Sequence, residues 1–208
     1  MSWLRWTAAI LVCGWLGQYP LAMLVPNMIM ERLYSKGVER VGYNQIAMRS
    51  RPDETSRDVV RPSPDLLYAS CIYNLEQGPV TISASVPERY WSMQLYQMNT
   101  DNFAGISNQR EQSFRAGKNV EVTLVGPDAN PAEFLSEGQG EVIQSPTTRG
   151  VMLLRASAIG DDSQAQASLE NSRCRAQEQE VQHTGNRQQV NRIDKKKNNN
   201  NYNEEASS

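Results

Sequence analysis

Residues Val60–Phe103 read VRPSPDLLYASCIYNLEQGPVTISASVPERYWSMQLYQMNTDNF, and this stretch decides the fold class. Its aromatic, β-branched and other apolar residues fall into three short runs, 66–75, 80–86 and 90–98, with turn residues such as Gly78-Pro79 and Pro87 between them. Runs of this length and composition, bounded in this way, predict strands. Because short turns favour antiparallel neighbours, we expect these three strands to lie side by side.

Alternation along these runs predicts which side chains face a core. A strand points successive side chains to opposite faces, so apolar residues at every second position indicate a half-buried strand. In the run 80–86, one face is expected to carry Val80, Ile82, Ala84 and Val86, and the other Thr81, Ser83 and Ser85. In the run 90–98, one face is expected to carry Trp91, Met93, Leu95 and Gln97, and the other Tyr90, Ser92, Gln94, Tyr96 and Met98.

Further elements are expected on the C-terminal side. Strands are predicted at 119–125, 141–144 and 150–155, and a helical turn at 131–135. A long loop, with room for a short strand, is predicted over 99–118. Asp161 or Asp162 is a good N-cap for a thinly amphipathic helix from Ser163 to about Gln182. The fold class is therefore mainly β: a small antiparallel β-sandwich-like domain with an N-terminal transmembrane helix and one C-terminal helix.

The N-terminal segment from Trp6 to Met30 contains no charged residue. About 20 apolar residues span the hydrocarbon core of a bilayer, and tryptophans favour the interface. Pro20 and Pro26 interrupt the run, and such breaks are better tolerated in membrane helices than in soluble ones. We therefore expect an uncleaved anchor with a kink, against two alternatives: a cleaved signal peptide, whose best site, Pro20-Leu21-Ala22, has an unfavourable proline, and a soluble core helix.

The chain divides by composition into four parts. These are an anchor (1–33), a linker rich in arginine (34–57), the β-rich domain (58–182) and a polar tail (183–208) that ends in Asn, Lys and Glu and is expected to be disordered. The anchor helix is expected to stop near Lys36, because Gly37 follows it.

Charge and motif content exclude several function classes. With 21 basic and 23 acidic residues, the net charge of −2 gives no reason to expect nucleic-acid binding. The three cysteines, Cys13, Cys71 and Cys174, lie far apart without metal-ligand spacing, and the spacing leaves a Cys71–Cys174 bridge open. The single histidine, His183, lies at the edge of the tail, which argues against Ser-His or Cys-His catalysis. Neither a metal nor another cofactor is expected.

The remaining candidates lie at predicted strand ends. An Asp–Arg pair beside tyrosines is suited to binding a polar ligand or to acid–base chemistry. A purely structural interpretation competes with this one: the aspartates cap turns, and Arg89 pairs with one of them. The weak ligand-binding candidates are Asp65, Tyr68, Arg89, Tyr90, Asp101 and Asn102.

Several separated blocks carry a resemblance to a known family. Arg61-Pro62-Ser63-Pro64-Asp65-Leu66-Leu67-Tyr68, Gly78-Pro79-Val80, Arg89-Tyr90-Trp91-Ser92 and Asn99-Thr100-Asp101-Asn102-Phe103 resemble the bacterial "domain of unknown function 1254" family, and more narrowly its short, membrane-anchored members. The resemblance covers roughly residues 55–180. It implies a mostly β domain, often exported or anchored, and no established reaction. The chain departs from longer members at Asn74 and Gln97, where those tend to carry an acidic residue.

Two indications of membrane orientation disagree. Arg5 alone precedes the apolar run, whereas Arg32, Lys36, Arg40 and Arg49 follow it, which by the positive-inside rule places the domain in the cytoplasm. The family resemblance instead implies the periplasm. We expect a single-pass protein of the bacterial inner membrane with a periplasmic domain that binds a protein partner or a small ligand. The alternative is a hydrolase-like or ligand-processing enzyme that uses Asp65, Arg89 and Asp101.

Overall fold

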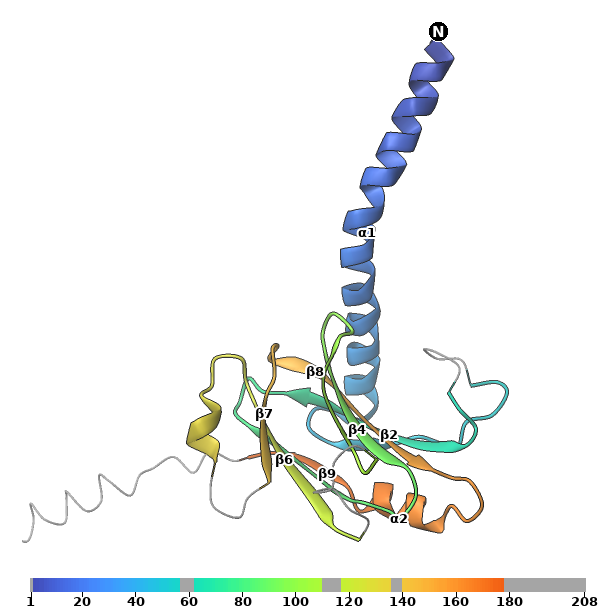
Figure 1. The fold of residues 1–208 in the computed structure, drawn as a ribbon. Helices are drawn as coiled ribbons and strands as arrows, with labels where there is room; N and C mark the ends of the chain where they lie inside the picture. Colours follow the sequence, from blue (N-terminus) through green and yellow to red (C-terminus); the bar gives the residue numbers. More distant parts are fainter. Residues whose placement is uncertain (1, 57–61, 110–116, 136–139, 178–208) are drawn as a thin grey trace, which may run out of the picture. The chain divides into compact units, whose positions relative to one another are not determined.

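The computed structural model describes residues 2–56, 62–109, 117–135 and 140–177, and these residues are mainly β. They form a five-stranded sheet, β1-β2-β8-β4-β5, and a four-stranded sheet, β7-β6-β3-β9 (Figure 1). In chain order the elements are α1 (Ser2–Val41), β1 (Ile46–Met48), β2 (Leu66–Asn74), β3 (Val80–Ser85), β4 (Trp91–Gln97), β5 (Asn102–Ser107), β6 (Asn119–Val125), η1 (Pro131–Phe134), β7 (Glu141–Gln144), β8 (Arg149–Ser157), α2 (Ser163–Glu170) and β9 (Arg173–Ala176). The expected fold class is confirmed.

One hydrophobic core joins the inner faces of the two sheets. Trp91, Met93 and Leu95 of β4 are buried in it together with Val80 and Ile82 of β3, as the alternation in the sequence predicted. Apolar surface removed from water contributes roughly 25 cal/mol per Å², so these faces supply most of the stabilisation of the sandwich. The outer face of β4 keeps its polar residues, and that face carries the site described below.

The pairing of the central strands differs from the expectation. Strands β2 and β4 both pair with β8, whereas β3 lies in the other sheet between β6 and β9. The turns after β2 and β3 therefore cross from one sheet to the other and do not close hairpins. The reason is that β2, β3 and β4 each have one strongly apolar face, and two sheets packed face to face bury all three. The ladders are antiparallel except for β6 and β7, which run parallel within the part of the chain that the structure describes.

Helix α1 is continuous through Pro20 and Pro26 and ends at Val41, beyond the stop expected near Lys36. Gly37 does not end the helix, because it serves close packing: a Cβ there would lie 2.5 Å from Cγ1 of Ile72 in β2. The residue that stops the helix is instead Gly42, directly after Val41, whose φ of +91° suits glycine and whose N–H donates to the carbonyl of Val38.

The C-terminal part of α1 packs on the outer face of the five-stranded sheet. Met30 and Tyr34 are buried against Ile72 of β2 and Val151 of β8. The Tyr34 hydroxyl donates to the carbonyl of Tyr73, and the side chain of Arg149 lies 5.3 Å from the Tyr34 ring centroid. Within residues 34–57, where we expected a linker, the structure thus has the end of α1 and strand β1, which pairs with β2.

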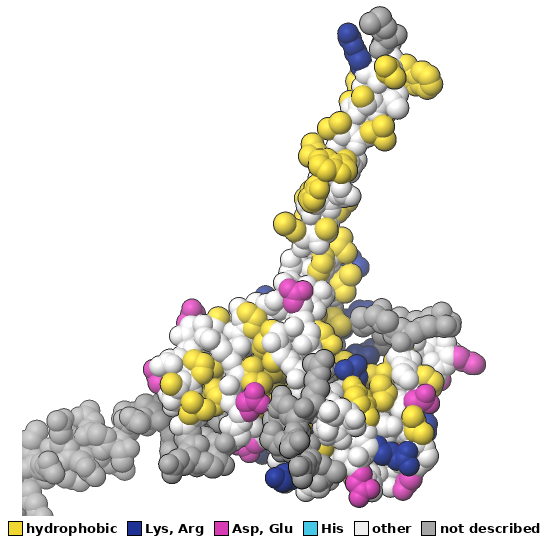
Figure 2. All heavy atoms as spheres, viewed as in Figure 1, with side chains coloured by type: hydrophobic (Ala, Val, Ile, Leu, Met, Phe, Trp, Pro, Cys, Tyr) yellow, Lys and Arg dark blue, Asp and Glu magenta, His cyan; other side chains and the backbone are white. Residues whose placement is uncertain are grey.

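The N-terminal part of α1 is exposed along its length and is long and apolar enough to cross a membrane, a property that it shares with signal sequences. Figure 2 shows hydrophobic side chains along this helix, whereas the surface of the sheets mixes acidic, basic and neutral side chains.

The helix expected from Ser163 to Gln182 is shorter in the structure. It ends at Glu170, and Arg173–Ala176 form β9 on the edge of the four-stranded sheet. The apolar face of this helix is thin, so a longer helix would bury little additional apolar surface. As strand β9, the following residues instead form backbone hydrogen bonds with β3 and bury Cys174. The polar tail 183–208 lies outside the described residues.

Candidate functional site

Asp101 belongs to the turn between β4 and β5. Its carboxylate accepts hydrogen bonds from Asn99 Nδ2 (2.7 Å) and Gln97 Nε2 (3.2 Å), and its backbone N–H donates to Asn99 Oδ1. Thr100 in this turn has a φ of +75°, a conformation that such side-chain bonds help to hold. The geometry is that of a turn-forming aspartate, as the structural interpretation of the sequence proposed.

Asp65 and Tyr68 lie at the start of β2. The Asp65 side chain is exposed, and its backbone carbonyl accepts a hydrogen bond from the Ala158 N–H (2.8 Å). The Tyr68 hydroxyl accepts a hydrogen bond from the backbone N–H of Ser63 (2.9 Å). These bonds fix the chain segment that leads into β2.

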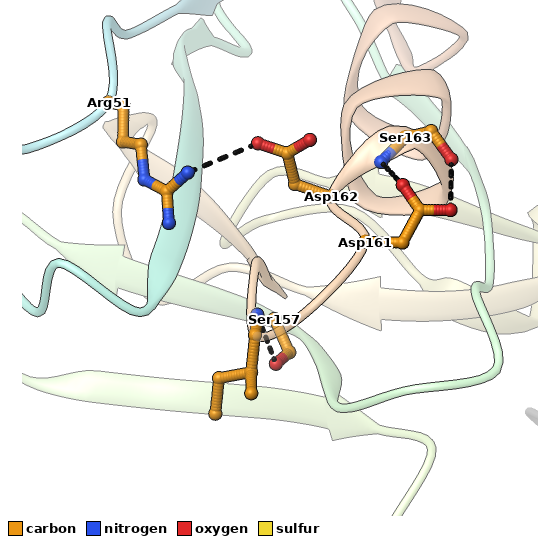
Figure 3. A network of polar contacts seen from close by, with 6 residues as sticks. Arg51, Ser157, Asp161, Asp162 and Ser163 are labelled. Carbon is orange, nitrogen blue, oxygen red and sulfur yellow. Dashed lines mark hydrogen bonds and ion pairs between the residues drawn. The ribbon is translucent and has the colours of Figure 1, made fainter.

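Arg89 lies near the segment that leads into α2. The Arg89 guanidinium lies beside Gly160: a Cβ added to that glycine would be 3.4 Å from Arg89 Nη2. The pKa of Asp161 is lowered mainly by the hydrogen bond from the Ser163 backbone N–H, and the charge of Arg89 adds to this lowering. Figure 3 shows Asp161 capping Ser163, with the adjacent Asp162 in an ion pair with Arg51 (3.3 Å). Arg89 therefore has Asp161 as its acidic neighbour.

The three residues of the expected enzyme site do not come together. Arg89 and Asp101 lie at opposite ends of the ladder between β4 and β8. Gln97, before the Asp101 turn, pairs with Gly150, whereas Trp91, just after Arg89, pairs with Ala156. Asp65 precedes Leu66, which pairs with Ser157 at the same end as Arg89. At about 3.3 Å per residue, Asp101 lies roughly 20 Å from the end that carries the other two.

A pocket of about 320 Å³ lies on the outer face of the five-stranded sheet. Strand alternation brings its residues together from three neighbouring strands, β8, β4 and β5, and from the turns that flank β4 and β5. The lining residues are Tyr90, Gln94, Gly105, Ser107, Gln109 and Arg155. Of the six residues expected from the sequence, Tyr90 lines this pocket, and Asn102 borders it through a hydrogen bond from Nδ2 to Gln94 Oε1 (2.6 Å).

Ser92, buried beneath the pocket, holds the guanidinium of Arg155 in position. The Ser92 hydroxyl oxygen accepts hydrogen bonds from Arg155 Nε (3.1 Å) and from the Tyr90 hydroxyl (3.0 Å). Within the described ranges, no carboxylate lies within 4.0 Å of the half-buried guanidinium of Arg155, and the two ion pairs found there join other residues. Among the residues that the structure describes, this arrangement holds the guanidinium in place and pairs it with no carboxylate.

The sequence indicated part of this pocket. The period of two in β4 put Tyr90, Ser92 and Gln94 on one outward face. Arg155 was missed, because it ends an apolar run, GVMLLR, and its position opposite β4 depends on the register Ser92↔Arg155.

Other polar groups lie away from the pocket. Burial raises the pKa of Tyr73 to about 12, although hydrogen bonds with Ser145 and Thr147 act in the opposite direction. Trp91 Nε1 is buried in the core without a hydrogen-bond partner among the described residues. The described residues also contain no group of three or more His, Cys, Asp or Glu suited to a metal ion.

Cys71 and Cys174 form a disulfide, a pairing that their spacing in the sequence left open. The bond joins β2 of one sheet to β9 of the other, with a sequence separation of 103 residues and a Cα–Cα distance of 6.5 Å. Both residues are buried. The bond covalently links the two sheets across the core.

Comparisons with known proteins extend this description. The fold is similar to that of the VPA0106 protein from Vibrio parahaemolyticus, at 16% identity and a TM-score of 0.53, over 73% of this chain and 35% of that one. An uncharacterised protein from Burkholderia cenocepacia matches at 15% identity and a TM-score of 0.42, over 64% of this chain and 34% of that one. The chain thus spans about a third of each. A comparison with the curated proteins finds no match.

A family model matches residues 43–176, which include the nine strands that the structure describes and the lining of the pocket. This range confirms the resemblance that the sequence blocks carried. The chain belongs to the family described as protein of unknown function DUF1254.

Proposed function

We propose that this chain is a single-pass protein of a bacterial inner membrane, whose β domain binds a small polar ligand at the envelope. The observation that carries the proposal is the pocket around Arg155, a cation held by Ser92 among neutral hydrogen-bonding side chains. Its volume of about 320 Å³ falls at the lower end of the range of small-molecule sites. The apolar, exposed N-terminal part of α1 serves as the anchor in this proposal.

The disulfide supports a periplasmic location for the domain. Disulfides persist in oxidising compartments such as the bacterial periplasm and are rare in the cytosol. The buried bond between Cys71 and Cys174 thus favours the side of the membrane that the family resemblance implied. It outweighs the count of basic residues after the apolar run, because that count rests on few charges.

The hydrolase-like alternative gains no support from the geometry. Asp101 is engaged in its own turn and lies at the opposite end of β8 from Asp65 and Arg89. General acid–base chemistry needs its groups within hydrogen-bond reach of one reacting centre.

Retention of small molecules tests the proposal. The full chain in lipid nanodiscs is incubated with the low-molecular-weight fraction of a periplasmic extract, and the retained compounds are identified by mass spectrometry. We expect wild type to retain a compound that Gly105→Phe loses, because the phenyl ring fills the pocket. Gly126→Phe is the matched control, since its Cβ position is open and lies away from the pocket. Equal retention by all three proteins, or none by wild type, contradicts the proposal.

A further inference from the structure

Three hydrogen-bond acceptors in and beneath the pocket are already used. Gln94 Oε1 accepts from Asn102 Nδ2, and Ser92 Oγ accepts from both Tyr90 and Arg155. Ser107 Oγ accepts from the backbone N–H of Gln109 (3.2 Å). A ligand that offers mainly donors therefore finds few free acceptors here.

The donors of the pocket, in contrast, remain available. Arg155 uses Nε for Ser92, and its two terminal nitrogens have no hydrogen-bond acceptor among the described residues. The amide nitrogen of Gln94 is in the same situation, because Asn102 engages only the oxygen. A guanidinium carries five N–H donors and no acceptor, and within the described ranges four of the five have no partner.

The charge and geometry of these donors select among anions. The terminal nitrogens of arginine form a planar fork that matches the two oxygens of a carboxylate. Arg155 is the one cationic side chain that lines the described pocket, so the pocket offers one planar fork, enough for one carboxylate group. The backbone N–H groups of β4 and β8 are committed to the ladders with their neighbours, so these two strands offer no backbone nest for a phosphate.

We infer that the ligand of this pocket carries a carboxylate, bound by the two terminal nitrogens of Arg155, with Gln94 Nε2 as an additional donor. This inference rests on the proposed ligand-binding function and adds the chemical class of the ligand. Ser92 and Tyr90 are positioning residues in this arrangement: they fix the guanidinium through Nε and leave its fork directed to the ligand.

The test is a titration of the full chain, labelled with ¹⁵N and held in nanodiscs of zwitterionic lipid. The probes are sodium succinate, sodium phosphate and glucose, added at matched ionic strength. The Nε–Hε signal of Arg155 and the backbone amide of Gly105 report binding. We expect a saturable shift with succinate. Arg155→Gln should weaken succinate binding about tenfold or more, because it removes charge-assisted hydrogen bonds.

Two further variants separate the fork from simple charge. Arg155→Lys keeps the charge but loses the planar fork, so succinate should bind more weakly than to wild type. Arg175→Gln removes an exposed arginine in β9 of the other sheet and should leave succinate binding unchanged. Circular dichroism confirms that each variant is folded.

The remaining outcomes overturn the inference in distinguishable ways. Stronger binding of phosphate or glucose than of succinate contradicts the carboxylate and leaves the proposed ligand binding intact. An unchanged succinate affinity in Arg155→Gln would show that Arg155 does not bind the carboxylate, and it would refute the inference. No saturable response to any probe, while wild type retains a compound without a carboxylate from the extract, refutes this inference alone. If the extract yields no retained compound either, the proposed function fails as well.

Discussion

At the scale of single residues, burial sets the behaviour of polar groups in this domain. The Tyr73 hydroxyl donates to the carbonyl of Tyr96 (3.1 Å) and shares a hydrogen bond with Ser145 Oγ (3.1 Å), deep between the sheets. The exposed Asp101 instead bonds within its own turn. The sequence predicted the turn role of Asp101 from its neighbours. It did not predict the partners of Tyr73, since Ser145 lies 72 residues away.

The raised pKa of Tyr73 predicts that the unfolding free energy of the domain falls at alkaline pH. Burial raises its pKa from 10.0 to about 12, so the folded state keeps the proton that the unfolded state releases. The resulting stabilisation is complete below pH 10 and falls as the pH rises toward about 12. Tyr73→Phe should cost roughly 1–3 kcal/mol of unfolding free energy at neutral pH and should show a smaller loss above pH 10. Urea unfolding at several pH values measures both effects.

The control for this prediction is Tyr19→Phe, which changes an exposed tyrosine in the N-terminal part of α1. It should keep the alkaline loss of wild type. An identical pH dependence in Tyr73→Phe and wild type would show that another group is responsible, for example Tyr34, whose pKa burial also raises.

At the scale of elements, long-range contacts decide the architecture. The alternation in β3 and β4 correctly predicted which side chains are buried, but the partners of β2, β3 and β4 came from β8, β6 and β9. The same applies to α1, whose last turns follow the packing of Gly37 against Ile72 beyond the stop read from the sequence. Strand β9 is held by its ladder with β3 and by the disulfide to β2.

Removal of the disulfide tests its contribution to the sandwich. The bond closes a loop with a sequence separation of 103 residues, and a native disulfide of this kind typically contributes about 2–5 kcal/mol. We expect the double variant Cys71→Ala, Cys174→Ala to unfold at a clearly lower urea concentration than wild type. Cys13→Ser is the matched control, because Cys13 is a free, exposed cysteine. Equal midpoints for the double variant and wild type would refute the structural role.

At the scale of the whole molecule, anchor, domain and disulfide together support one topology. The apolar part of α1, which is long enough to cross a membrane, leads directly into the turns that pack on the sheet, so the proposed anchor and the domain share one helix. Disulfides are typical of domains that form where thiols oxidise, which agrees with the periplasmic location proposed above. The family assignment agrees with the fold, and it assigns no reaction.

A reporter fusion tests this topology. Alkaline phosphatase fused to the C-terminus should be active in cells, because that enzyme needs the oxidising periplasm to form its own disulfides. An inactive fusion at normal expression would place the domain in the cytoplasm. The intact mass of the purified chain is measured in the same preparation: a mass of 23.4 kDa shows that α1 is retained, whereas a smaller one shows cleavage of a signal peptide.

The sequence by itself determined the apolar N-terminal helix, the positions of most strands and the faces that they bury. These properties depend on neighbouring residues and on periods of two or 3.6, which a linear pattern contains. Only the tertiary structure decided which strands pair, that Cys71 meets Cys174, and that Arg155 lies beside Ser92. Those outcomes depend on the burial of several apolar faces at once, between segments that are far apart in the chain. The pocket belongs to this second group, because three strands on one face of the sheet build it.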